Sequence, residues 1–185
     1  MTQGLHSNTV WPMQPGGGIF LICMGVGLVY GALMQGDAIT FGLESGFCAG
    51  VVGIVVAIMM ARGRFGRPTA LHRFVVLAAI ALELTAFAIL ARSGFLSGGQ
   101  TTTKWSVALL IVALHFIVMR WSHGPLMLWL TLTSIIWIGL AYVLGFSLPA
   151  LIAGDGLLKI VFGIVMAAPL WLTIRARYGL EATIE

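Results

Sequence analysis

The chain has 185 residues, of which 59% are hydrophobic and 9% are charged. A soluble domain carries about 25% charged residues, so a water-soluble globule of this length could not bury so much apolar surface, and lipid must be its main solvent. The formal net charge of +4 comes from bases at the ends of apolar runs. Bases in such places are typical of membrane topology signals, and we expect no nucleic-acid partner.

Six apolar segments are each long enough to cross the hydrocarbon core of a bilayer, which is about 30 Å thick. Because lipid offers no partner to exposed backbone groups, each segment is expected to be helical. The predicted fold is therefore an all-α, polytopic bundle of six transmembrane helices in a single domain, preceded by a short cytoplasmic tail at residues 1–17. The predicted spans are approximately residues 18–35, 41–61, 72–92, 104–121, 125–145 and 151–174.

The basic residues predict the orientation of the bundle. Seven of the ten bases fall on the side of the termini, two fall on the opposite side, and Lys159 lies inside the last span. The seven are Arg62, Arg64, Arg67, Arg73, Arg120, Arg175 and Arg177, and the two are Arg92 and Lys104. Under the positive-inside rule both termini are cytoplasmic. The tail lacks a basic region before its apolar run, so we expect no signal peptide, and we place the protein in a bacterial inner membrane.

An internal similarity links the second and sixth spans. Residues 46–57 align with residues 156–167, sharing glycines seven apart followed by Ile-Val-x-Ala. The preceding spans also share a Gly-Leu-x-Tyr sequence, at Gly27 and Gly139. The pattern suggests a parallel repeat of the helix 1–2 and helix 5–6 hairpins, with chance similarity among glycine-rich helices as the alternative.

Two ionisable residues are predicted near the middle of adjacent antiparallel spans. Glu83 lies in the third span and His115 in the fourth, each eleven residues after its predicted start. Ionisable side chains are expensive at this depth, and a Glu and a His at matched depth can share a proton. We interpret the two as the titratable centre of a proton or ion pathway, or alternatively as a neutral hydrogen-bonded pair that holds two helices in register.

The last span places Asp155 four residues before Lys159. This spacing puts both side chains on one helical face, where they could form a buried pair. In the alternative, a shorter helix starts at Gly156 with Asp155 as its N-cap, and Ser45 caps the second span with Glu44 at the outer interface. Asp37, Glu44 and Asp155 would then form an acidic outer mouth. We include Glu44, Asp155 and Lys159 in the predicted ion pathway.

Known catalytic and cofactor patterns are missing from the sequence. There is no HExxH sequence, and His115 has no second His at matched depth for a b-type haem. We therefore expect no enzyme, no cofactor and no metal site. Residues 113–119 (ALHFIVM) resemble the His-Phe-bearing helix of small bacterial six-helix membrane proteins of unassigned function, and that resemblance implies no activity.

These observations favour a small transporter or channel. The acidic mouth and titratable centre would suit a proton, a small cation or an amine-like solute, and we expect the protein to form a homo-oligomer in the lipid bilayer. The alternative is a non-transporting assembly factor or accessory subunit whose buried polar residues only hold helices together.

Overall fold

A computed structural model describes residues 11–60, 68–95 and 101–178, and its regular structure in these ranges is entirely α-helical. The helices are α1 (Gln14–Met34), α2 (Ala38–Met60), α3 (Ala70–Arg92), α4 (Thr101–His123), α5 (Leu126–Val143) and α6 (Leu148–Tyr178). All six are long and apolar enough to cross a membrane. The prediction of an all-α bundle with six spans is confirmed, and the chain is a multi-pass membrane protein.

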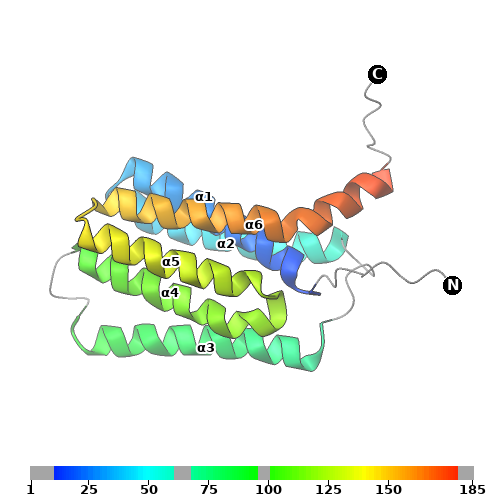
Figure 1. The fold of residues 1–185 in the computed structure, drawn as a ribbon, viewed down its shortest axis with the longest axis horizontal. Coiled ribbons are helices and arrows are strands. Elements are labelled where there is room, and N and C mark those ends of the chain that lie inside the picture. Colours follow the sequence, from blue (N-terminus) through cyan, green and yellow to red (C-terminus); the bar gives the residue numbers. More distant parts are fainter. Residues whose placement is uncertain (1–10, 61–67, 96–100, 179–185) are drawn as a thin grey trace, which may run out of the picture.

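The helices begin earlier than the apolar runs suggested. The first helix starts at Gln14 with Pro15 in its opening turn, so residues 14–17 are helical and do not belong to a tail. Proline suits this position because the first backbone N–H groups of a helix lack intrahelical partners anyway. The sixth helix starts at Leu148, carries Pro169 in its interior and bends in its last turns (Figure 1), as expected where proline removes a backbone hydrogen bond.

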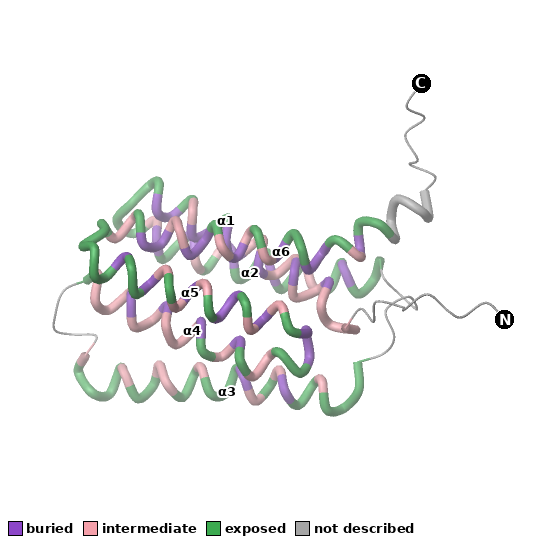
Figure 2. Tube along the Cα trace, viewed as in Figure 1, coloured by how far each residue is buried: buried purple, intermediate pink, exposed green. Residues whose placement is uncertain are grey.

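Helices that are consecutive in the chain pack as neighbours, except α2 and α3. Helices α3, α4, α5 and α6 lie side by side, and α1 packs against both α6 and α2 (Figure 1). Half of the membrane-crossing window of α1 is buried, against 11% for α3, and Figure 2 shows the buried positions concentrated away from α3. Helix α1 is therefore the centre of the packing, whereas α3 lies at an edge and contacts mainly α4.

Glycines allow α1 to approach both of its neighbours closely. A methyl group at Gly25 would overlap the carbonyl oxygen of Gly156, and one at Gly163 would lie 2.6 Å from the carbonyl oxygen of Gly18. On another side of α1, Gly27 meets Gly42 of α2 in the same way. Small residues permit such close backbone packing in membranes, where the hydrophobic effect does not drive helices together.

The predicted hairpin repeat is not reflected in this packing. Gly46 of α2 and Gly156 of α6 both contact α1, although in a repeat Gly156 would contact α5. Gly27 is enclosed by α2, whereas a methyl group at its counterpart Gly139 would meet no described atom within 4 Å. The shared glycines thus mark two helices that use one common partner.

Candidate functional site

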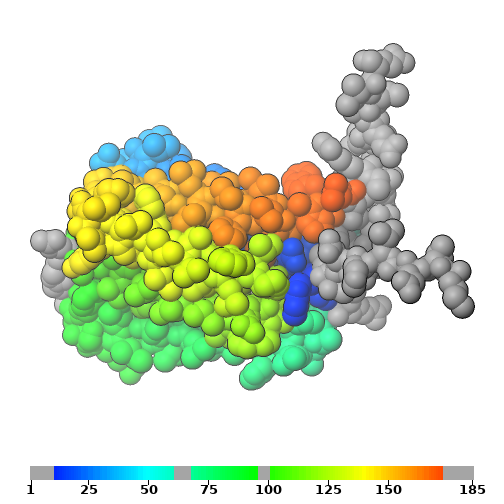
Figure 3. Space-filling model, viewed as in Figure 1, coloured from blue at the N-terminus to red at the C-terminus, as the bar shows by residue number. Residues whose placement is uncertain are grey.

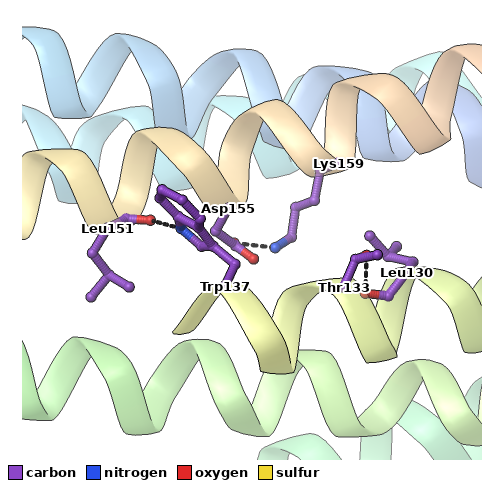
Figure 4. Close-up of polar contacts among 6 residues, drawn as sticks. All are labelled: Leu130, Thr133, Trp137, Leu151, Asp155 and Lys159. Atoms are coloured by element: carbon purple, nitrogen blue, oxygen red, sulfur yellow. Dashed lines mark hydrogen bonds and ion pairs between the residues drawn. The ribbon is translucent and has the colours of Figure 1, made fainter. Parts of the chain in front are cut away.

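A charged pair is enclosed in the apolar packing of α6. Lys159 Nζ donates a hydrogen bond to Asp155 Oδ2, and the two side chains are 2% and 0% exposed (Figure 4). Because α6 begins at Leu148, both residues lie in the helix interior, one turn apart on one face. The structure therefore contains the buried pair that the four-residue spacing predicted.

The capping alternative is wrong for both helices. Asp155 follows seven helical residues and cannot cap α6. Ser45 also lies inside its helix, because α2 begins at Ala38, and its hydroxyl donates to the Gly42 carbonyl oxygen at 3.2 Å. The capping alternative placed both helix starts too late, because it took the polar residues Ser45 and Asp155 as helix boundaries.

The predicted acidic mouth is likewise not formed as expected. Asp155 is fully buried, whereas Asp37 and Glu44 are exposed. Glu44 lies in the second turn of α2, a helix that packs on α1 and not on the helices carrying Glu83 and His115. The structure thus separates Glu44 from the other four residues of the predicted pathway.

Glu83 and His115 meet across the interface between α3 and α4. The distance from His115 Nδ1 to Glu83 Oε2 is 3.1 Å, and the side chains are 10% and 24% exposed, respectively. The contact lacks hydrogen-bond geometry at Nδ1, and the imidazole ring also lies 4.3 Å from the ring of Phe116. The two residues are therefore in contact, as their matched depth predicted, without a hydrogen bond that fixes the position of a proton.

The two pairs come from helices that pack in one row. Glu83 and His115 lie on α3 and α4, whereas Asp155 and Lys159 lie on α6. Helix α5 lies between α4 and α6, and Thr131 of α5 donates to the Ala113 carbonyl oxygen of α4 at 3.1 Å. Four ionisable side chains from three helices thus lie within one continuously packed set of helices.

Helix α5 contributes polar groups to the same region. Trp137 Nε1 donates to the Leu151 carbonyl oxygen at 2.9 Å, and the Trp137 ring packs over Gly154 (Figure 4). Ser134 is fully buried, and its hydroxyl lacks a hydrogen-bond partner among the described residues. Ser134 is not among the predicted site residues, because its place opposite α6 depends on how α5 and α6 are paired.

A second group of polar side chains lies where α4 ends and α1 begins. His123 is 6% exposed, its Nδ1 lies 2.7 Å from Ser122 Oγ, and its ring packs against Gly17. His72 instead caps α3 together with Thr69. His72 is therefore held at the start of its own helix, whereas His123 is buried against α1.

Metal-binding and disulfide chemistry find no support in the described ranges. No group of three or more His, Cys, Asp or Glu side chains gathers there as a metal site would require. Cys23 and Cys48 are both free thiols.

The chain belongs to a family of unknown function (DUF6609), whose model matches residues 6–170. No curated protein and no solved structure matches it. The family description assigns no activity, so functional inference depends on the geometry of the site.

Proposed function

We propose that the protein is a small transporter or channel that moves protons across a bacterial inner membrane, alone or together with a small cation or an amine-like solute. The observation that supports this proposal is the contact between Glu83 and His115, at 3.1 Å, inside a bundle of apolar helices. Carboxylate and imidazole groups exchange protons with each other, and both are expensive to keep within a bilayer without a use.

The position of Lys159 adds to the case. A purely structural Glu–His contact would need no further charges, yet the buried Asp155–Lys159 pair lies in the same apolar bundle, where charges interact more strongly than in water. Moving a proton between Glu83 and His115 changes the local charge that Lys159 experiences, so the two pairs respond to each other. Such coupling suits a site through which charge passes.

Proton flux in proteoliposomes tests the proposal. An imposed potential should drive acidification that a trapped pH-sensitive dye reports, and Glu83→Gln should abolish most of this flux because an amide cannot carry the proton. Glu44→Gln is the matched control, since it makes the same chemical change on the exposed face of α2. It should leave the flux unchanged.

Two results would contradict the proposal. If Glu83→Gln leaves the flux intact in folded protein, the Glu83–His115 contact is not part of a proton path. If the wild-type protein moves neither protons nor small cations, the chain acts instead as an assembly factor or accessory subunit, and its buried polar groups serve helix packing.

A further inference from the structure

Two fully buried oxygen atoms lack hydrogen-bond partners among the described residues, namely Ser134 Oγ and Asp155 Oδ1. An unsatisfied buried polar atom destabilises the folded state, and lipid surroundings offer no water to relieve it. The Lys159 ammonium group satisfies only Oδ2, the other carboxylate oxygen. Two strong acceptors thus remain open in the middle of an apolar bundle.

The pairing of α5 with α6 places these two oxygens at one level. Trp137 of α5 is bonded to Leu151 of α6, and the two helices are antiparallel neighbours. Ser134 lies three residues before Trp137, and Asp155 lies four residues after Leu151, so both are displaced by one turn in the same direction. They occupy the same side of the α5–α6 interface without bonding to each other.

The interface already accommodates a monovalent cation in the form of the Lys159 ammonium group. In Figure 4 the Lys159 side chain runs from α6 toward α5 and ends at the Asp155 carboxylate. A lysine side chain is a flexible stem with a compact charge, so its head group can leave the Asp155 carboxylate when another cation takes its place.

We propose that Asp155 and Ser134 form a binding site for one monovalent cation of about the size of an ammonium ion, for which Lys159 competes as a tethered cation. This inference rests on the proposed function and names the cation that accompanies the proton. When a cation binds Asp155, it displaces the Lys159 ammonium group, and the Glu83–His115 contact releases one proton; when that proton returns, the cation leaves and Lys159 pairs with Asp155 again. Net charge in the bundle stays constant, because one proton is exchanged for one cation.

A pocket lies between α4 and α5, near the end of the bundle that carries Phe146. This open pocket of about 390 Å³ is lined by Thr102, Thr103, Ala141, Tyr142, Gly145 and Phe146. Phe146 packs edge-on against Trp137 at 5.7 Å, and Trp137 covers Gly154, the residue before Asp155. Figure 3 shows α4, α5 and α6 adjoining on one face of the molecule. The two aromatic rings therefore stand between the pocket and the proposed cation site.

Thermal unfolding of the purified protein in detergent tests the site without measuring transport. A cation that binds only the folded state raises Tm with the logarithm of its concentration. The Tm measured in ammonium chloride or potassium chloride should be higher than the Tm measured in N-methyl-D-glucamine chloride at equal ionic strength. Lys159→Met should enlarge this rise because the tethered competitor is gone, and Lys159→Met with Asp155→Asn should remove it.

Ser134→Ala keeps the proposal testable if Lys159→Met does not fold. This small change should reduce the cation-specific rise in Tm of the otherwise intact protein. Thr133→Ala, at the residue directly before Ser134 in α5, should leave that rise unchanged. The proposal is overturned if wild-type and Lys159→Met proteins gain no more from potassium or ammonium than from the bulky cation. Cation-specific stabilisation without any proton flux would retain the cation site and reject the transport proposal. Proton flux without such stabilisation would retain the transport proposal and reject the cation site.

Discussion

At the scale of single residues, Asp155 and Lys159 stabilise the bundle only while both are present. Each charge has lost its water, and removing one partner of a buried pair costs about 3 to 5 kcal/mol because the other is left unpaired. Lys159→Met should therefore lower the free energy of unfolding by an amount in this range, and adding Asp155→Asn should recover part of the loss. A double-mutant cycle in mild detergent measures the coupling. Near-zero coupling between positions 155 and 159 would show that the pair does not hold α6 in place.

A contact between two side chains could be predicted where spacing within one helix, or matched depth in adjacent spans, placed them together. The Asp155–Lys159 pair follows from a four-residue spacing, and the Glu83–His115 contact from matched depth in neighbouring spans. The place of Ser134 opposite α6 could not be predicted, because small shifts between α5 and α6 change which side chains meet. Glu44 was misjudged for the same reason, since depth alone does not tell which face of α2 turns toward the other helices.

At the scale of helices, the glycines of α1 predict where added volume is least tolerated. Gly25→Ala would push the new methyl group into the backbone of α6 at Gly156, where no side chain can move aside. We expect a loss of roughly 1 to 3 kcal/mol or more in the free energy of unfolding. Gly139→Ala is the matched control, because its methyl group would meet no described atom within 4 Å. Relief of glycine's entropy cost should make it neutral or stabilising by up to about 1 kcal/mol. Equal effects of the two changes in detergent would contradict close packing of α1 on α6.

The existence of the helices was easier to predict than their neighbours. Apolar length identified all six spans, with ends displaced by a few residues where a polar residue interrupted the run or a proline could begin the helix. The seven-residue glycine spacing shared by α2 and α6 corresponds to close packing on α1. The same spacing left a repeated hairpin and chance similarity open, since a glycine shows that a backbone approaches and not which one.

At the scale of the whole molecule, the orientation in the membrane remains a prediction from the basic residues. Helix α3 offers a direct comparison, because Ala70 at its start and Ser93 just after its end are both exposed. With Cys23 and Cys48 replaced by alanine, Ser93→Cys should react with an impermeant thiol reagent in intact cells. Ala70→Cys should react only after the membrane is permeabilised. The reason is the excess of arginine beside Ala70, which is held on the cytoplasmic side during insertion.

The orientation also decides which end of the bundle receives the cation. The pocket at Thr102 and Tyr142 lies near the start of α4 and the end of α5, on the same side as Ser93. If Ser93→Cys labels from outside, the pocket opens outward and the His123 end faces the cytoplasm, so the proposed cation site would be reached from outside. If Ala70→Cys labels in intact cells and Ser93→Cys does not, the bundle is inverted and the proposed cation site would be reached from the cytoplasm. Labelling of both positions only after permeabilisation would confirm that the cysteines are accessible but would place both on one side, which a single crossing by α3 does not allow.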